Sequence, residues 1–293
     1  MKLLIAGASG FIGTHVLRRL PSDWEVFAIS RKPIAAPPNT TLINVDLTNH
    51  DFARSLPGQI DAVLSLAQSA HYAEFPAKTR QVFDVNVMSS ISLVDYAIRA
   101  RASTFVHAST GSVYEPYGGL LKEDALLSPS SLNGVSKFVA ERSLELYDSL
   151  IGLCCLRIFF PFGPGQKNRL VQLVHKRLSE CQPVDLDGPD GMVFTPTYVE
   201  DIADIMATAI EEGWRGTINI ASQETRSVRS VAEGIAHILG AKPQFSHTGS
   251  QSTNITPDTT KLYTLYEHAK MTDFQTALHA TIDSIANDGT LPT

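Results

Sequence analysis

Three things are scarce in this sequence: cysteine, clusters of like charge and long hydrophobic runs. The 293 residues include three cysteines, two of them adjacent at Cys154 and Cys155, which is neither a disulfide framework nor a metal-ligand spacing. We expect all three to be reduced core residues, and we expect no metal site. No apolar run approaches the ~18 residues that a membrane span requires, and glycines interrupt the apolar start too early for a signal peptide. These features favour a cytoplasmic protein without a membrane partner.

The charge balance excludes a further class. With 24 basic and 30 acidic residues the formal net charge is −6, and the basic residues form no block along the chain. A nucleic-acid-binding surface needs clustered positive charge, so no nucleic acid is expected as a partner. Apolar residues make up 43% of the chain, which is enough for a sizeable core. The length fits one large domain or two closely joined ones.

The most informative segment is the glycine-rich run at residues 7–13, which follows the apolar residues 3–6. Such a run between a buried strand and a helix lets the backbone approach the pyrophosphate of a dinucleotide, which then faces the positive end of the helix dipole. An amphipathic stretch with Val16, Leu17 and Leu20 follows, and this is the context that the motif requires. The expected cofactor contacts in this run are Gly7, Ser9, Gly10, Phe11, Ile12 and Gly13.

Strand-like and helix-like patterns alternate through the first half of the chain. Near-continuous apolar runs are typical of parallel strands covered on both faces, and they predict strands at residues 25–30, 41–46, 60–67, 105–109 and 153–160. Helical periodicity predicts long helices at about 79–101 and 132–150. This alternation predicts an α/β fold with a doubly wound parallel sheet of the Rossmann type.

The pattern changes after Gly163, where a Gly-Pro-Gly turn leads into shorter elements. We predict a dinucleotide-binding domain at residues 1–163 and a smaller, mixed α/β substrate-binding region at 164–293, with residues 197–222 returning to the first domain. The expected elements are helices at about 170–180, 199–212, 228–239 and 273–285, a strand at 217–221 and a loop at 243–257.

Several further motifs follow one another in a specific order. They are Asp46-Leu47, Leu66-Ala67-Gln68, Asn86-Val87, residues 108–114, residues 134–137, Arg157 with residues 163–166, and residues 198–203. Together with the glycine run they resemble the extended short-chain dehydrogenase/reductases, the group that contains nucleotide-sugar epimerases, dehydratases and reductases. The resemblance covers nearly the whole chain. It implies a Rossmann fold, a nicotinamide cofactor, and hydride transfer on a nucleotide sugar or a related carbonyl or hydroxyl compound.

The resemblance also implies three catalytic side chains. In this family a tyrosine exchanges a proton with the substrate, and a Ser or Thr binds the same substrate oxygen. A lysine four residues after the tyrosine holds the nicotinamide ribose and lowers the tyrosine pKa. Thr110 fits the hydroxyl position and Lys137 the lysine position, but Asn133 stands at the tyrosine position.

An amide exchanges no proton near neutral pH, so Asn133 leaves three alternatives open. The protein is an enzyme whose proton is handled by water or by another group, a cofactor-binding sensor or subunit without ordinary redox turnover, or a variant inactivated by engineering. Asn133 can still bind a carbonyl or orient a water. The groups expected near the pocket that could take over the proton are His71, Tyr72, Tyr114, Glu115 and Tyr117.

The end of the second predicted strand indicates which nicotinamide nucleotide is bound. An acidic residue at this position would accept the ribose hydroxyls of NAD, but this chain has Ser30, Arg31 and Lys32, which suit a 2′-phosphate. We therefore predict NADP, with NAD as the alternative. By the resemblance, the further cofactor contacts are Asp46 and Leu47 at the adenine, Leu66, Ala67 and Gln68 beside the ribose, Lys137 at the nicotinamide ribose, and Phe160.

The substrate is less well defined. Many relatives carry Arg-Asp-Phe shortly before the Tyr-Val-x-Asp segment, and that arginine meets a substrate phosphate, whereas this chain has Phe194-Thr195-Pro196. A nucleotide sugar is the expected substrate, and a natural-product ketone or a lactone is the alternative. Relatives often pair through two long helices, so a homodimer is expected through residues 79–101 and 132–150.

Overall fold

The computed structural model describes residues 1–49, 51–266 and 271–288, and the chain divides into two compact units. Unit 1 comprises Met1–Pro116, Glu123–Ile158 and Ile202–Asn219. Unit 2 comprises Tyr117–Lys122, Phe159–Asp201 and Ile220–Thr293. Within the described residues, no helix is both long enough and apolar enough to cross a membrane.

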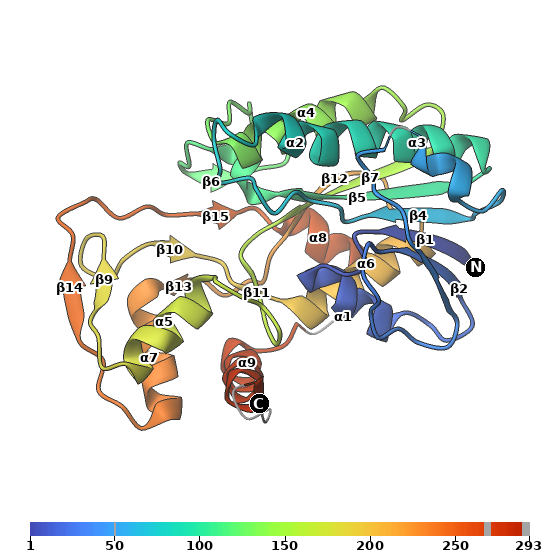
Figure 1. The fold of residues 1–293 in the computed structure, drawn as a ribbon. Helices are drawn as coiled ribbons and strands as arrows, with labels where there is room; N and C mark the ends of the chain where they lie inside the picture. The colour runs from blue at the N-terminus through green and yellow to red at the C-terminus, as the bar shows by residue number, and fades with distance from the viewer. Residues whose placement is uncertain (50, 267–270, 289–293) are drawn as a thin grey trace. The chain divides into compact units, whose positions relative to one another are not determined.

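Unit 1 is built on a seven-stranded sheet with the strand order β12-β7-β5-β4-β1-β2-β3 (Figure 1). The pairs that join β1 to β5 and β7 are parallel, and the chain changes direction along the sheet between β1 and β4. In open α/β sheets, ligands bind at the carboxyl ends of the strands at such a switch point. This sheet confirms the predicted fold class. The strands are β1 (Lys2–Ala6), β2 (Glu25–Ile29), β3 (Thr40–Ile43), β4 (Ala62–Ser65), β5 (Thr104–Thr110), β7 (Gly152–Ile158) and β12 (Gly216–Ile220).

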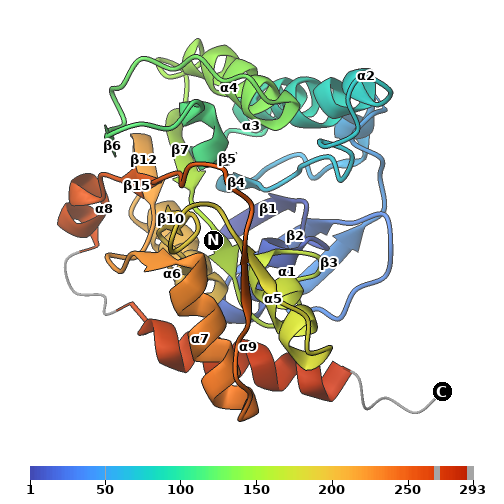
Figure 2. The same cartoon turned by 90° about the vertical axis from the view of Figure 1, so that its left-hand side faces the viewer.

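Helices cover both faces of this sheet (Figures 1 and 2). α1 (Phe11–Arg19) and α6 (Val199–Glu211) lie on one face. On the other lie α2 (Thr79–Phe83), the π-helical turn η2 (Asp84–Met88), α3 (Ser89–Arg99) and α4 (Leu132–Glu145). Short 3-10 helices, η1 (Phe52–Ser55) and η3 (Gly111–Tyr114), complete the unit. The central strands are buried because their side chains are apolar toward both helical layers.

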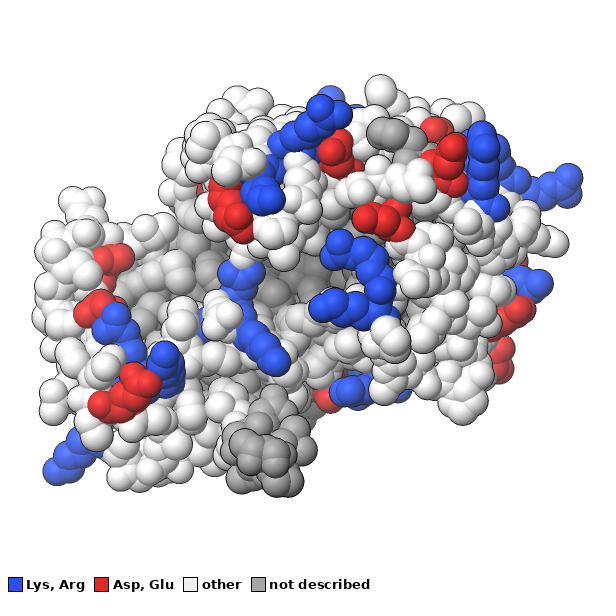
Figure 3. Space-filling model, viewed as in Figure 1, with Lys and Arg blue, Asp and Glu red and all other residues white. Residues whose placement is uncertain are grey.

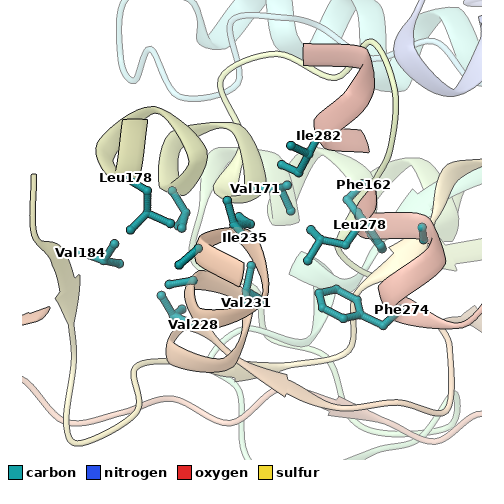
Figure 4. Packing of buried hydrophobic residues seen from close by; sticks show 14 of the residues in the cluster. Phe162, Val171, Leu178, Val184, Val228, Val231, Ile235, Phe274, Leu278 and Ile282 are labelled. Carbon is teal, nitrogen blue, oxygen red and sulfur yellow. The ribbon is translucent and has the colours of Figure 1, made fainter. Parts of the chain in front are cut away.

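Unit 2 combines helices with two-stranded pairs. The helices are α5 (Leu170–Ser179), α7 (Val228–Leu239), α8 (Thr260–Leu265) and α9 (Phe274–Asp288). The pairs are β6 (Leu120–Leu121) with β15 (Thr256–Pro257), β8 (Pro161–Phe162) with β11 (Thr197–Tyr198), β9 (Val184–Leu186) with β14 (Phe245–His247), and β10 (Val193–Phe194) with β13 (Arg226–Ser227). Apolar faces of α5, α7 and α9 meet in one core (Figure 4).

The two ends of α7 show why the sequence folds locally as it does. The Ser227 hydroxyl accepts from the Ser230 N–H, and the Ser230 hydroxyl accepts from the Ser227 N–H, so the two residues form a capping box. At the other end Gly240 ends the helix with a φ of 63°, a conformation that glycine adopts without a Cβ clash. The helix bounds predicted from periodicity, 228–239, are therefore confirmed.

Several local predictions are wrong. The third strand is shorter than predicted and lies at the sheet edge, where Leu42 is 42% exposed, so it is not covered on both faces. The predicted loop at 243–257 contains β14 and β15, because its residues pair with β9 and β6. The helix predicted at 132–150 ends at Glu145. Cys154 and Cys155 are buried and not disulfide-bonded, as predicted, but Cys181 is exposed.

Charged side chains of both signs are dispersed over the face drawn in Figure 3. Elsewhere in the described part of the chain, partly exposed ion pairs include Arg229–Asp190 at 3.0 Å and Arg177–Asp185 at 2.8 Å. Neither sign forms a continuous field across this face, and surface pairs of this kind contribute little to stability.

Candidate functional site

The glycine turn after β1 is shaped for close backbone approach. Gly7 has a φ of 90°, and a Cβ there would lie 2.8 Å from the Ala67 nitrogen. A Cβ at Gly13 would lie 2.4 Å from the Gly7 oxygen, so α1 could not pack on the turn with a side chain at that position. Gly10 differs because it is exposed and its Cβ would meet one atom, at 3.2 Å. The turn is therefore closed on the protein side and open on the other, which fits a pyrophosphate.

The start of α1 adds donors at the same place. The helix begins at Phe11 with Gly10 as N-cap and no side-chain cap, so its first N–H groups are available to an anion. Ser9 is exposed, and Phe11 and Ile12 are half-buried. The Phe11 ring lies edge-on to His15, with 5.6 Å between ring centroids. That these residues contact a nucleotide stays a prediction.

The turn after β2 lies beside the glycine turn, because Ile29 is the parallel partner of Ala6. The buried Ser30 hydroxyl donates to the Lys32 carbonyl at 2.6 Å and accepts from the Lys32 N–H at 3.2 Å. The serine therefore closes the turn, while Arg31 and Lys32 are exposed. An anion at this turn would meet the two cations rather than the hydroxyl.

Asp46 and Leu47 follow β3, and the charge of Arg31, in the turn after β2, acts on the Asp46 carboxylate. One Asp46 carboxylate oxygen accepts from both the N–H and the hydroxyl of Thr48, each at 2.9 Å. These bonds, and more weakly the charge of Arg31, hold the pKa of Asp46 below its ordinary value against the opposing effect of burial. Asp46 is exposed and Leu47 is half-buried. Arg31 and Asp46 therefore lie close enough for the charge of one to act on the other.

The loop after β4 lies against the glycine turn. The Leu66 N–H donates to the Ala6 carbonyl at 2.8 Å, and the Leu66–Ala67 backbone is what a Cβ at Gly7 would strike. Ala67 is buried and Gln68 is exposed. The two loops that flank the switch point of the sheet therefore pack directly on one another.

The first turn of α4 is held against the segment that follows β5. The Ser131 hydroxyl caps the helix by accepting from the Gly134 N–H at 3.1 Å, and a Cβ at Gly134 would lie 2.5 Å from the Ser112 oxygen. Thr110, half-buried at the end of β5, accepts from the Ser112 N–H at 3.2 Å. Thr110 therefore caps η3, and it borders the start of the helix that carries Asn133.

Lys137 is buried rather than an ordinary surface lysine. It is 1% exposed, and its Nζ donates to the carbonyls of Ala108 at 2.8 Å and Ala67 at 3.4 Å. Burial lowers the pKa of Lys137 to about 8, although Cys155 and Glu141 act in the opposite direction. Through Ala67, the ammonium is joined to the loop that packs on the glycine turn.

Asn133 carries a polar atom that is buried and has no partner. Its Oδ1 makes no hydrogen bond, while its backbone carbonyl accepts from the Ser136 hydroxyl at 3.0 Å. Ser136 in turn accepts from Asn86 Nδ2 at 2.9 Å, and Asn86 Oδ1 accepts from the Ser69 N–H at 2.8 Å. The Asn133 side chain thus keeps an unused acceptor, whereas the backbone around it is firmly held.

Sequence reasoning missed Asn86 and Ser136 as supports of this helix start. Asn86 is fully buried in the π-helical turn η2, a local irregularity that is frequent at functional sites. A polar residue on the apolar side of the helix predicted at 79–101 was the available signal. It could not reveal a partner 50 residues away in the chain.

A second buried polar cluster lies further along α4. Glu141 is bound by Arg157, with Nη2 at 2.8 Å from Oε2, and by the Ser109 hydroxyl. A further Arg157 nitrogen, Nη1, donates to the Tyr114 hydroxyl at 2.7 Å, and this hydroxyl donates to Asn219 at 2.8 Å. The charge-paired network was also missed, since Arg157 drew notice only as part of a motif.

This network decides against Tyr114 as a substitute proton donor. Burial raises the pKa of Tyr114, although Arg157 and Asn219 act in the opposite direction, and its hydroxyl is engaged on both sides. Among the other candidates, His71 Nδ1 lies 2.6 Å from Glu74 Oε1, and Glu115 accepts from the Ser131 N–H at 3.2 Å.

Two predicted residues belong to unit 2 rather than to the cluster above. Tyr117 lies in its first segment, and Phe160 lies at the start of its second. The Phe160 backbone has a φ of 36°, and its ring packs on Phe194 with 4.8 Å between centroids.

A cavity in unit 1 contains none of the predicted site residues. It has a volume of about 500 Å³ and is lined by Glu141, Leu144, Glu145, Asp148, Leu153, Cys155, Arg215, Gly216 and Thr217. In the described part of the chain no three His, Cys, Asp or Glu side chains form a group that could hold a metal ion.

Comparison with known proteins shows which family the chain is similar to. The model of the NAD dependent epimerase/dehydratase family matches residues 3–221. An uncharacterized UDP-glucose epimerase of Bacillus subtilis (strain 168), YtcB, is 28% identical over 272 residues, which cover 83% of each chain. The UDP-glucose 4-epimerase of Azospirillum brasilense is 26% identical over 271 residues, covering 82% of this chain and 78% of the relative.

A solved structure shows the same relationship in three dimensions. The UDP-glucuronic acid 4-epimerase from Bacillus cereus, in complex with UDP-glucuronic acid and NAD, superposes with a TM-score of 0.87 at 25% identity. The match covers 98% of this chain and 99% of that one. The likeness therefore spans both units.

Proposed function

This chain belongs to the NAD dependent epimerase/dehydratase family, and from that premise we propose that it transfers a hydride to or from the sugar of a nucleotide sugar. Membership confirms the predicted resemblance to the extended short-chain dehydrogenase/reductases and supports an enzyme of that type. The relatives named above act on UDP-glucose or UDP-glucuronic acid, by their names. A UDP-linked sugar is accordingly the first substrate class to test.

The observation that carries this proposal is the buried Lys137, joined by its hydrogen bonds to the ends of β4 and β5. A buried ammonium is costly unless it is bonded, and its two carbonyl partners leave one of three N–H donors for a ligand. We assign that donor to the nicotinamide ribose. The glycine turn, Arg31, Asp46 and the loop at residues 66–68 would bind the rest of the cofactor.

The chemistry at the sugar is divided between the cofactor and two side chains, Thr110 and Asn133. A bound nicotinamide would take or supply the hydride. Thr110 would hold the reacting oxygen, and the free Oδ1 of Asn133 would accept a hydrogen bond from that hydroxyl or from a water beside it. Because the amide cannot exchange a proton near neutral pH, the proton would leave through the water that Asn133 orients.

For the cofactor we propose NADP, whereas the Bacillus cereus structure contains NAD. The proposal depends on the exposed Arg31 and Lys32, which can pair with a 2′-phosphate. Asp46 follows β3 and does not stand at the end of β2, the position where an acidic residue would favour NAD.

The cofactor assignment can be tested on the purified protein. Mass spectrometry of the small molecules released on denaturation should identify a nicotinamide nucleotide, and calorimetry should show tighter binding of NADPH than of NADH. Arg31→Ala should reduce that preference about tenfold, since a charge-assisted bidentate contact would be lost. Arg54→Ala, which removes an exposed arginine of η1, is the matched control. Equal affinity for NADPH and NADH in the parent protein would refute the assignment to NADP.

A second candidate function is cofactor binding without turnover, and it is favoured by Asn133 together with the engaged hydroxyl of Tyr114. Here the protein would bind nucleotide and sugar as a sensor or subunit. Stopped-flow measurements with UDP-glucose and oxidised cofactor discriminate the two candidates. Any substrate-dependent reduction of the cofactor favours the enzyme.

The assembly proposed is a homodimer through the helical layer that contains α3 and α4. Leu146 and Leu150, just after α4, are 81% and 65% exposed, and apolar side chains of this size on a surface are often covered by a partner. Sedimentation analysis would determine the oligomeric state.

A further inference from the structure

His107 is a buried histidine of unit 1 with one ring nitrogen that makes no hydrogen bond. It lies on β5 and is fully buried. Its Nδ1 is 3.3 Å from the hydroxyl oxygen of Ser65 on the neighbouring strand β4. Its Nε2 has no partner, although polar atoms in a protein interior are nearly always bonded. A buried ring nitrogen of this kind requires a reason beyond packing.

The bond between His107 and Ser65 joins the two strand ends that hold Lys137. Ala108, whose carbonyl accepts from Lys137 Nζ at 2.8 Å, directly follows His107. Ala67, whose carbonyl accepts from the same ammonium at 3.4 Å, lies two residues after Ser65. Because His107 and Ser65 are register partners, their bond fixes β5 against β4 just before both carbonyls.

The His107 ring points toward α4, the helix that carries Lys137. Alternate residues of a strand share a face of the sheet, so His107 lies on the same face as Ser109, whose hydroxyl donates to Glu141 of α4. Lys137 lies one helical turn before Glu141. Burial, and with it the charge of Lys137, lowers the pKa of His107 well below its ordinary value. The ring is therefore uncharged at neutral pH.

The neighbouring titratable groups do not supply a competing charge. Cys155 of β7 is the register partner of His107 on the other side, and burial raises the pKa of its thiol well above the ordinary value, so the thiol is uncharged. The Glu141 carboxylate is paired with Arg157 at 2.8 Å. The charge that acts on the His107 ring is therefore the ammonium of Lys137.

This ammonium selects one tautomer of the ring. An uncharged imidazole has one N–H and one lone pair. If Nδ1 donates to Ser65, then Nε2 carries the lone pair, and if Nδ1 accepts, then Nε2 carries an N–H without a partner. A positive charge attracts a lone pair and repels an N–H, and a buried N–H without a partner is rarer than an acceptor without one. The proton of His107 is therefore expected on Nδ1.

We propose that His107 is a positioning residue for Lys137: its Nδ1 ties together the strand ends that hold the ammonium, and its Nε2 lone pair stabilises the positive charge. The inference rests on the proposed function, in which Lys137 holds the nicotinamide ribose. Since the lone pair acts through its field, the remaining N–H of the ammonium stays available to the cofactor.

Two substitutions separate the roles of the two ring nitrogens. The side-chain oxygen of His107→Gln can replace Nε2, whereas the shorter amide of His107→Asn replaces only Nδ1, so it keeps a partner for Ser65 and loses the lone pair. The measurement is the difference in free energy of unfolding between each protein and the same protein carrying Lys137→Met, by urea denaturation from pH 6 to 10.

In the parent protein this difference should begin to narrow at about pH 8, where Lys137 titrates in the folded state. In His107→Asn the narrowing should begin about one pH unit lower, because the charged form loses a stabilising neighbour. In His107→Gln it should still begin at about pH 8. A merely structural histidine would leave the onset unchanged in both variants.

His175→Asn is the matched control, because it makes the same change at a histidine of α5 whose pKa is also lowered by burial. Its onset should equal that of the parent protein. An unchanged onset in His107→Asn would overturn the role of Nε2. An onset that falls equally in His107→Asn and His107→Gln would overturn it as well, since the glutamine oxygen would then not replace the lone pair.

The tautomer is measured on the parent protein, so this test does not depend on whether a variant folds. Long-range ¹H–¹⁵N NMR spectra with labelled histidine should show His107 protonated at Nδ1 and unprotonated at Nε2 from pH 6 to 9. A proton on Nε2, or a titration of the ring within this range, would overturn the proposal.

Calorimetry connects His107 to the cofactor. At pH 8 His107→Asn should bind NADPH about fivefold more weakly than the parent protein, because roughly fivefold fewer molecules would carry the charged donor. His107→Gln should bind NADPH within twofold of the parent protein. A parent protein that binds no nicotinamide nucleotide would overturn the proposed function, while the onset of narrowing and the tautomer would still decide whether His107 positions the ammonium.

Discussion

Both halves of α4 bury polar groups against the same sheet, but the two halves differ in whether those groups are hydrogen-bonded. In the second half, Glu141 is bonded by Arg157 and Ser109, and Arg157 extends the network to Tyr114. In the first half, the Asn133 amide oxygen is buried without a partner. Glu141 is 2% exposed and Lys137 is 1% exposed, so burial alone does not separate the two halves.

This difference in hydrogen bonding indicates which half of α4 can bind a ligand. A buried charge whose hydrogen-bonding capacity is filled has nothing left to offer a ligand, and its removal breaks the fold. A buried polar group with unused capacity carries a desolvation penalty that a ligand can relieve. The second half of α4 is therefore structural by this criterion, and the first half is the candidate site.

The largest expected effect comes from breaking the filled network. Arg157→Met would leave the Glu141 carboxylate buried without its charged partner, and the free energy of unfolding should fall by ~3–5 kcal/mol, measured by urea denaturation. Arg142→Met removes the partner of Glu145 on the exposed side of the same helix, and it should cost less than ~0.5 kcal/mol. A loss below ~1 kcal/mol in Arg157→Met would mean that the network is not structural.

The next effect concerns the charge at the candidate site, and it depends on pH. Since the folded-state pKa of Lys137 is lowered from 10.5 to about 8, the unfolded chain binds more protons between these values, and the stability of the wild type should rise with pH across this window. At pH 7 Lys137→Met should be the more stable protein, and its advantage should shrink by roughly 2–3 kcal/mol on going to pH 10.

Urea denaturation at pH 7, 8, 9 and 10 measures this difference, because the groups that Lys137 does not influence titrate equally in both proteins. For Lys176→Met, at an exposed lysine of α5, the difference in free energy of unfolding from the wild type should not change with pH. If the difference in free energy of unfolding between Lys137→Met and the wild type stayed constant with pH, burial would not lower the pKa of Lys137.

The smallest effect is expected at the unpartnered amide. Asn133→Tyr should raise the rate of hydride transfer with UDP-glucose roughly tenfold or more, because a phenol one helical turn before Lys137 can exchange a proton. Cofactor fluorescence follows the rate, and the melting temperature should change little. A lower rate in this variant would instead favour a specialised use of the amide in the natural site.

Much of the fold was predictable because it depends on local and periodic features. The alternation of apolar runs with helical patterns predicted the parallel sheet, and the capping serines and Gly240 set the bounds of α7. Errors arose where pairing partners are remote. β14 and β15 are strands only because they pair with β9 and β6, and β3 is exposed only because the sheet ends there.

The residues of the candidate site could be predicted from the sequence, but their burial and their hydrogen-bond partners could not. The glycine turn could be identified from its spacing, since positive φ at Gly7 and close packing at Gly13 are requirements of the turn itself. Lys137 could be named from a motif, but an exposed helix lysine fits the same motif. Asn86 and Ser136 fall within motifs, but their contact could not be predicted, because it joins α4 to the π-helical turn.

By itself, the sequence determined the parallel α/β fold and the glycine turn, because these follow from short-range geometry and hydrophobic periodicity. The positions of Thr110, Asn133 and Lys137 were identified through the resemblance to the family. Only the tertiary structure decided which polar groups are paired. Packing α4 on the sheet brings Arg157 to Glu141 and leaves the oxygen of Asn133 without a partner. Hydrogen-bond satisfaction depends on distances across the fold, and no pattern along the chain contains them.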